Sequence, residues 1–323
     1  MASNIFLAIT ITFMYAAPLI LTALGGVVSE RSGVINIGLE GIMVMGALGG
    51  ALMMKFLPAG TSAFVVVLLT VLASILLGMI YSLLLAVAAV NFKADQTLVG
   101  TAMNLLGTAA ATVFVKAMNT AADPDNVSST IQYLDGRKAF LVDLGGFEFN
   151  WCMLLALVAL VIAYVALYKT RFGLRLRACG ENPQAADSLG INVYKMRYAG
   201  TTISGALAGM GGFVYALTTA NCASNGDVAG FGFLALAVMI FGNWKPVNIA
   251  VSSLLFGLFK CIAASYASID INGDGVYMLA EIGISAHLYR MLPYIVTLLV
   301  LAFTSKSSRA PKAEGIPYDK GQR

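Results

Sequence analysis

The most specific arrangement of chemistry-bearing residues is an acidic loop in the last fifth of the chain. Asp270, Asn272, Asp274 and Glu281 follow the spacing of a calcium-binding loop, with a glycine directly after Asp274. Ca²⁺ takes carboxylate and amide oxygens in loops of this kind between two helices. Against this, Met278 occupies a position that is usually polar, and the sequence offers no second loop to pair with the first. Calcium is therefore a hypothesis beside an ordinary acidic loop, and no other cofactor is expected.

A second group of polar residues lies within or beside apolar stretches, where charged groups are costly and commonly face a protein interior or a water-filled path. Glu40 lies within a Gly-rich break at 29–41, and Thr97 and Thr101 share a predicted helical face with two amides. Either this group lines the path of a solute or it holds helices together, with Arg31 paired to Glu40 or Glu30. The candidates for a solute path are Asn36, Glu40, Gln96 and Asn104.

Lys260 stands near the middle of another apolar stretch. Pairing with a carboxylate and snorkelling of its ammonium group to a polar edge are equally open interpretations.

Motifs of several enzyme classes are missing. The chain has no Gly-x-x-x-x-Gly-Lys-Ser/Thr phosphate loop, so it does not hydrolyse ATP by that route. His287 is the only histidine, no Gly-x-Ser-x-Gly elbow accompanies it, and the four cysteines lack metal-ligand spacing. We expect a non-catalytic protein whose energy comes from a partner.

The elements that must position these residues are membrane helices. Hydrophobic residues make up 59% of the chain and charged residues 11%, against about 25% charged in soluble proteins. Apolar runs predict an all-α polytopic membrane protein with about nine transmembrane helices, within a range of 8–10. The expected spans are 4–28, 37–57, 63–91, 97–117, 150–168, 198–220, 229–242, 247–269 and 283–303.

Glycine modifies this picture in two ways. The seventh span is only about fourteen residues long and follows a Gly-rich break at 225–233, which predicts a discontinuous helix. Small residues at 205–212 predict close approach of neighbouring helices.

Charge predicts the orientation. The loop 119–149 is acidic, whereas the loop 169–197 and the tail 306–323 are basic. The positive-inside rule then places the N-terminus and 119–149 outside, and 169–197 and the tail in the cytoplasm, for a multi-pass protein of a plasma membrane surrounded by lipid. Residues 1–305 form one transmembrane domain in this interpretation. The net charge of +4 orients the chain, and no nucleic-acid partner is expected.

The basic loop contains a short helix with both of its ends marked. Asn182 is a preferred N-cap, Pro183 suits the first helical position, and Gly190 suits the position just past the end. A capped two-turn helix on a cytoplasmic loop is a docking element for another protein.

Several motifs together resemble the permease subunits of bacterial ABC importers for simple sugars and branched-chain amino acids, and residues 310–318 resemble the nucleoside (guanosine-type) branch. These motifs lie at 29–41, 94–97, 173–183, 185–187, 190–193 and 235–237.

The resemblance implies an ABC permease fold that works by alternating access. It also implies a second and paralogous permease subunit, a cytoplasmic ATPase and an extracytoplasmic solute-binding lipoprotein. The family's ATPase-contacting segment maps onto Gly180, Glu181, Asn182, Pro183, Ala185, Ala186, Asp187 and Gly190.

The expected function is that of a permease subunit of an ATP-driven nucleoside importer. A simple-sugar importer is the alternative within the family. An ion-coupled transporter using Glu40, Asp95 or Lys260, and a membrane scaffold or receptor component, are alternatives from other classes.

Overall fold

The computed structural model describes residues 2–58, 60–132, 140–143, 148–220, 223–266, 285–304 and 309–321. One helix lies in each of the nine apolar runs. They are α1 (Ala2–Glu30), α2 (Leu39–Phe56), α3 (Ala63–Ala86, continued by the π-helical turn Val87–Asn91), α4 (Gln96–Ala122), α6 (Trp151–Lys169), α9 (Val193–Thr218), α10 (Phe231–Phe241), α11 (Pro246–Ser265) and α13 (Ala286–Thr304). Two further helices, α7 (Arg171–Glu181) and α8 (Pro183–Ser188), lie in the basic loop.

The lengths and composition of these helices confirm an all-α polytopic membrane protein. Among the described residues, six helices are long and apolar enough to cross a membrane. They are Phe6–Glu30, Leu39–Phe56, Ala63–Asn91, Gln96–Ala122, Trp151–Lys169 and Pro246–Ser265. By contrast, α10 has 11 residues and is about 16 Å long, roughly half the hydrocarbon thickness of a bilayer. The break at 225–233 therefore does precede a half-length helix.

The centre of the fold is α9, which packs against α1, α2 and α3. A Cβ atom added to Gly46 of α2 would lie 2.1 Å from the carbonyl oxygen of Gly209 in α9, so these backbones touch directly. The prediction of close packing from the small residues at 205–212 is thus confirmed.

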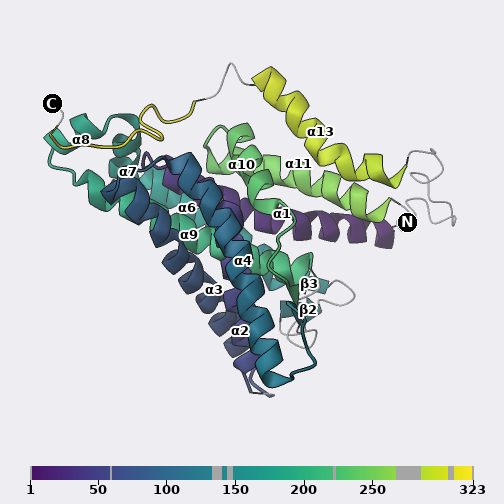
Figure 1. Cartoon of the computed structure of the whole chain (residues 1–323). Helices are drawn as coiled ribbons and strands as arrows, with labels where there is room; N and C mark the ends of the chain where they lie inside the picture. Colours follow the sequence, from purple (N-terminus) through teal and green to yellow (C-terminus); the bar gives the residue numbers. More distant parts are fainter. Residues whose placement is uncertain are drawn as a thin grey trace.

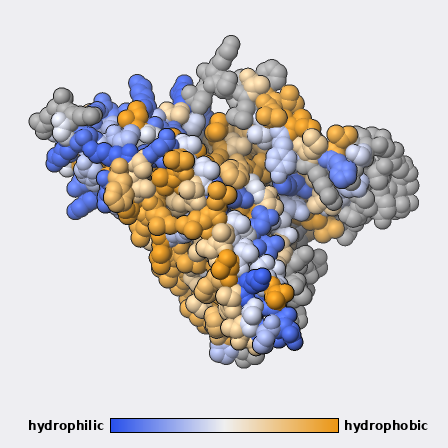
Figure 2. All heavy atoms as spheres, in the orientation of Figure 1, coloured by the Kyte–Doolittle hydropathy of each residue, from blue (hydrophilic) through white to orange (hydrophobic). Residues whose placement is uncertain are grey.

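Around this centre the helices spread into two arms, one containing α2, α3 and α4 and the other containing α1, α11 and α13 (Figure 1). α7 and α8 lie together at one end of the molecule, beside the C-terminal segment. Figure 2 shows extensive apolar surface over the first arm, as expected for a lipid-facing wall.

Two antiparallel strand pairs complete the described chain. β1 (Ile131–Gln132) pairs with β4 (Ala223–Ser224), with Ile131 opposite Ser224. β2 (Leu141–Asp143) pairs with β3 (Glu148–Asn150). The first pair ties the acidic loop after α4 to the segment that leads into α10.

The proposed calcium ligands, Asp270, Asn272, Asp274 and Glu281, lie outside the described residues. In the described part of the chain, no three His, Cys, Asp or Glu side chains converge to hold a metal ion.

Candidate functional site

The predicted docking helix is present as α8, with its predicted caps. The Asn182 side chain accepts a hydrogen bond from the Ala185 N–H at 3.1 Å, and Pro183 is the first helical residue. Gly190 has φ +79°, a left-handed conformation that ends the helix region without strain. Helix α7 was not predicted; Thr170, whose hydroxyl accepts from the Gly173 N–H, is the N-cap signal that would have indicated it.

The structure divides the predicted ATPase-contacting residues between surface and interior. Gly180, Pro183 and Ala186 are buried, Asp187 is half-buried, and the exposed residues are Glu181, Asn182, Ala185 and Gly190. Sequence reasoning missed Leu189, which is 81% exposed directly after α8. If α8 docks a partner, Leu189 offers an exposed apolar side chain beside that helix.

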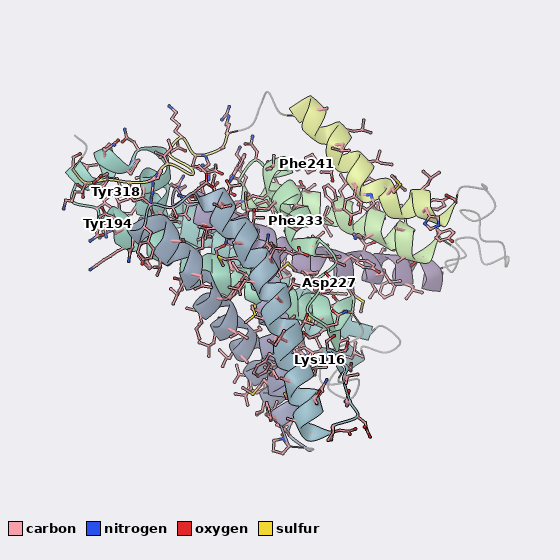
Figure 3. All side chains as sticks on the ribbon, viewed as in Figure 1. Lys116, Tyr194, Asp227, Phe233, Phe241 and Tyr318 are labelled. Carbon is pink, nitrogen blue, oxygen red and sulfur yellow. The ribbon has the colours of Figure 1, made fainter. Side chains whose placement is uncertain are left out.

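The C-terminal segment 309–321 is part of the same unit. The Ala313 N–H donates to the Gly180 carbonyl at 2.8 Å, and the Tyr318 side chain is buried. Its ring lies 5.3 Å from that of Tyr194 at the start of α9 (Figure 3). This segment, predicted from the sequence to be a separate tail, therefore packs against the unit that contains α7 and α8.

Arg31 connects the end of α1 to α7. Its Nη1 lies 3.6 Å from the Glu181 carboxylate in α7, and its Nη2 donates to the Trp244 carbonyl at 3.3 Å. Neither expected ion pair of Arg31 forms among the described residues: Glu40 lies beyond the turn at Gly33 (φ +95°) and bonds to the start of α10, and the Glu30 carboxyl, although near the Arg31 guanidinium, forms no salt bridge with it. The Glu30 carboxylate instead accepts a hydrogen bond from the Trp244 indole N–H.

Trp244 reaches these groups from a turn with unusual backbone geometry. Asn243 and Trp244 both have positive φ, +50° and +54°, between α10 and α11. Two consecutive non-glycine residues in this region cost conformational energy and persist only where contacts hold them. Here the indole and the carbonyl of Trp244 are held by Glu30 and Arg31.

Glu40 closes the N-terminus of the half-length helix. Its Oε1 accepts from the Gly230 N–H at 2.8 Å, and its Oε2 accepts from Gly232 at 2.6 Å and Phe233 at 3.3 Å. The side chain is only 8% exposed. A helix start leaves unsatisfied N–H groups and a partial positive charge. A carboxylate accepts hydrogen bonds from the N–H groups and compensates the charge. The two Gly-rich breaks therefore meet at this residue.

Gln96 and Asn36 hold the first break from two sides. Gln96 Oε1 accepts from the Ile35 N–H at 2.7 Å, and Asn36 Nδ2 donates to the Ser204 hydroxyl at 2.9 Å. Both side chains are buried. Among the described residues, Gln96 Nε2 and Asn36 Oδ1 have no hydrogen-bond partner.

Asn104 joins α4 to the start of α2. Its Oδ1 accepts from the Gly41 N–H at 2.9 Å, and its Nδ2 donates to the Ile37 carbonyl at 3.0 Å. The predicted shared face on α4 is consequently divided, since Asn104 and Gln96 point inward whereas Thr97 and Thr101 are exposed.

Lys260 adopts neither of its two expected arrangements. Its Nζ lies 4.9 Å from the ring centre of Phe231 and 5.5 Å from that of Tyr294. These are cation–π contacts, which stabilise an ammonium group most strongly where water is scarce. Tyr215, 4.8 Å from Phe231, extends the aromatic group around the start of α10.

One face of α4 carries exposed polar side chains along most of its length. We call Thr97, Thr101, Thr108, Thr112 and Lys116 the α4 polar stripe; their spacing places them within about 100° of one another around the helix. A Cβ atom on Gly226 would lie 2.4 Å from the Thr112 hydroxyl, so the segment before α10 lies against this stripe. Figure 2 shows a pale and blue band here beside the apolar surface, and Figure 3 marks Lys116 and Asp227 within this region.

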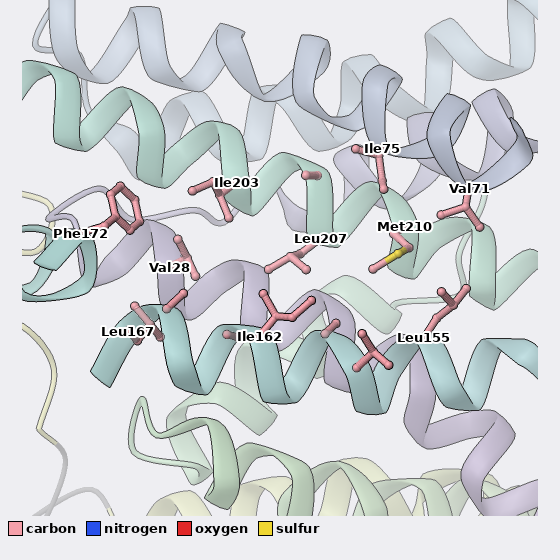
Figure 4. A pocket seen from close by; sticks show the side chains of 15 residues that line it. Val28, Val71, Ile75, Leu155, Ile162, Leu167, Phe172, Ile203, Leu207 and Met210 are labelled. Atoms are coloured by element: carbon pink, nitrogen blue, oxygen red, sulfur yellow. The ribbon is translucent and has the colours of Figure 1, made fainter. Parts of the chain in front are cut away.

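A groove of about 360 Å³ between α1, α3, α6 and α9 is a poor candidate for a polar solute. Its lining, which includes Val28, Ile162 and Leu207, consists of apolar side chains alone (Figure 4). It offers no hydrogen-bond partner, so polar recognition must occur elsewhere.

The model of the branched-chain amino acid transport system / permease component family matches residues 8–301. The chain belongs to this family.

Curated relatives resemble the permease along its whole length. It is 41% identical to the guanosine ABC transporter permease protein NupQ of Bacillus subtilis, over 97% of this chain and 96% of the relative. It is also 41% identical to the nucleoside ABC transporter permease protein NupC of Lactococcus lactis, over 96% and 95%. NupB, a second nucleoside ABC transporter permease protein of the same strain, is 26% identical over 94% and 85%. No solved structure matches the chain.

Removal of the Glu40 carboxylate is expected to destabilise the permease. In Glu40→Ala, three N–H groups at the start of α10 lose their acceptor, which we expect to lower the unfolding free energy by about 3 kcal/mol. Glu40→Gln keeps one acceptor oxygen and should lose less. Thermal unfolding in detergent measures both, with Asp125→Ala in an exposed loop as control. Wild-type stability of Glu40→Ala would show that the cap is dispensable.

The C-terminal segment should respond to pH through Glu314. Burial raises the pKa of Glu314, and this effect outweighs the opposing effects of its hydrogen bond with the Glu30 carboxyl and of the nearby Arg31 guanidinium. A raised carboxyl pKa means that the stability it contributes is complete at low pH and is lost as the pH rises through the folded-state pKa. Glu314→Gln mimics the protonated form, so it should protect the segment from proteolysis at about pH 8 and change little at about pH 4.

Asp319 provides a control of opposite sign for this experiment. Its carboxylate lies 2.7 Å from Lys93 Nζ, and that contact lowers the pKa of Asp319. Asp319→Asn should therefore loosen the segment at about pH 8, where the pair is charged. Equal protection of wild type and Glu314→Gln at both pH values would contradict the role given to Glu314.

Proposed function

We propose that this permease is one of two paralogous membrane subunits of an ATP-driven nucleoside importer. The observation that carries the proposal is 41% identity, over nearly the full chain, to a guanosine and a nucleoside ABC transporter permease protein. In one Lactococcus strain, two proteins named as nucleoside permeases are both similar to this chain, at 41% and 26%. That difference supports a pair of unequal subunits, with this chain of the NupC type.

In this proposal an ATPase subunit docks on α8 and hydrolyses ATP, because the permease has no phosphate loop of its own. The docking end is cytoplasmic, the N-terminus lies outside, and an extracytoplasmic lipoprotein delivers the nucleoside. A continuous set of contacts leads inward from α8. Glu181, the last residue of α7, contacts Arg31, and Arg31 contacts Trp244. Trp244 follows α10, whose start is held by Glu40. Movement of the docking helices would thus reach the half-length helix.

The proposed nucleoside path runs along the α4 polar stripe, with the second permease subunit closing its other side. Hydroxyl groups and Lys116 offer hydrogen bonds to ribose and base, as a polar solute requires. Four buried side chains support this path from behind. Glu40, Gln96 and Asn104 accept hydrogen bonds from the backbone of the two breaks, and Asn36, within the first break, donates to the Ser204 hydroxyl of α9. Their contribution is to position the wall of the path.

An ion-coupled mechanism has weaker support. Asp95 Oδ1 accepts from the Leu98 N–H at 2.9 Å as the N-cap of α4, and Glu40 caps α10. The carboxylates that would carry coupling ions thus already have structural partners.

Substitution of the exposed leucine should uncouple the permease from its ATPase. Leu189→Asp places a charge on the docking surface, and we expect nucleoside uptake to fall by at least tenfold while the folded subunit still inserts. The measurement pairs radiolabelled guanosine uptake with ATPase activity of the reconstituted complex. Ile316→Asp, which alters an exposed apolar side chain outside α8, is the matched control. Normal coupling in Leu189→Asp would exclude this surface from ATPase docking.

Loss of hydroxyl groups from the α4 polar stripe should weaken nucleoside uptake. Thr101→Val/Thr108→Val keeps side-chain size but removes two hydroxyl groups, which should lower guanosine uptake at limiting concentration roughly tenfold. Leu106→Val, on the neighbouring exposed face, is the control. Unlabelled nucleosides should compete for uptake and simple sugars should not. Competition by a sugar alone would overturn the nucleoside assignment.

A further inference from the structure

A basic cleft lies between α7, the turn before α11 and the C-terminal segment. Its volume is about 520 Å³, and five cationic side chains line it against one carboxylate. The charged residues are Arg31, Arg177, Lys245, Arg309, Lys312 and Glu181. The cleft belongs neither to the exposed surface of α8 nor to the α4 polar stripe.

Most of this positive charge has no carboxylate partner. Arg31 forms the one salt bridge that the described residues show in the cleft, with Glu181 at 3.6 Å. Arg31 Nε has no hydrogen-bond partner in the described chain, although the Glu30 and Glu314 carboxyls lie near its guanidinium without lining the cleft. The Arg177 guanidinium lies 4.8 Å from the ring centre of Tyr168. Unpaired cations facing one cavity indicate a site for an anion.

The cleft opens at the level of the membrane surface. Tyr168 lies at the end of α6, where an aromatic residue marks the lipid headgroup region, and Lys245 precedes α11. A second groove, of about 300 Å³ and almost entirely apolar, lies further along the same two helices between Leu160 and Leu254. Leu160 precedes Tyr168 by eight residues, about 12 Å along α6. A phosphorylated headgroup and an acyl chain of one lipid can therefore occupy the two cavities together.

We propose that the basic cleft and the α6–α11 groove bind an anionic phospholipid. The cations hold the headgroup phosphate through charge-assisted hydrogen bonds, and the groove takes an acyl chain. The group that the cations bind in this proposal is a phosphate. A soluble phosphate ion carries the same group as the lipid headgroup. The separate apolar groove, about 12 Å away along α6, favours the lipid. This inference rests on membrane insertion of the permease and is independent of the nucleoside it carries.

The experiment measures lipid retention by the purified, full-length permease. Native mass spectrometry counts phospholipids that remain bound after titration with phosphatidylglycerol or phosphatidylcholine. Lys245→Gln/Arg309→Gln should weaken phosphatidylglycerol binding roughly 30-fold, because each basic residue near an anionic surface contributes about a fivefold factor. Lys169→Gln/Arg171→Gln removes two exposed cations at the same membrane level outside the cleft and should retain binding. Lys245→Arg/Arg309→Lys should also retain it.

A second pair of variants tests the acyl groove. Ala250 lines the groove, so Ala250→Phe should block the chain and reduce retention at least fivefold. Val251→Phe, the exposed neighbour in α11, should leave retention unchanged. Thermal unfolding confirms that each variant is folded.

Four outcomes would overturn the proposal. These are unchanged retention in the cleft variant, an equal loss in the Lys169/Arg171 control, equal binding of phosphatidylcholine, and stabilisation by inorganic phosphate as large as that by phosphatidylglycerol. The last would assign the cleft to a soluble phosphate. Loss of ATPase association in Lys245→Gln/Arg309→Gln with lipid retention intact would assign it to the partner protein.

Discussion

A helix that begins within the membrane must find acceptors for its first N–H groups, because no water is available there to bond them. In this permease the carboxylate of Glu40 supplies the acceptors for α10, and much of the surrounding architecture follows from that requirement. The start of α2 must lie against the start of α10, which brings the two Gly-rich breaks together. Close contact is possible because Gly232 has no side chain; an added Cβ would lie 2.5 Å from the Glu40 backbone.

The break between α1 and α2 holds both ends of α10. Glu30 and Arg31 bind Trp244 just after its C-terminal end, and Glu40 binds its N-terminal end. Residues 34–38 run between these two points of contact. Gln96 and Asn104 then fix this stretch to α4. Half-helix, break and α4 therefore form one bonded unit, through which movement of α7 and α8 would reach the start of α10 in the proposed mechanism.

The sequence was sufficient for features that depend on local chemistry. The lengths of the apolar runs predicted where nine of the helices lie. Asn182, Pro183 and Gly190 predicted the position of α8, because capping residues act within a few positions of a helix end. It was insufficient where a partner comes from a distant segment. Arg31 pairs with Glu181 and Glu40 bonds to Gly230, and nothing in the local spacing distinguishes these partners from nearer charges. The division of α4 into inward amides and outward hydroxyls likewise depends on where the first break lies in space.

The α4 polar stripe supports the proposal that a second permease subunit covers this face. A lysine facing hydrocarbon at the centre of a bilayer costs roughly 3 kcal/mol, and several exposed hydroxyl groups add to that cost. Lys116 and the stripe threonines would therefore be unfavourable against lipid, although α4 is long and apolar enough to span the membrane. The cost disappears if water or a second polar wall covers this face. A paralogous subunit placed there provides both, since two such faces would enclose a hydrated path while their apolar flanks remain in contact with lipid. The requirement for a partner and the position of the proposed path thus follow from the same exposed polar residues.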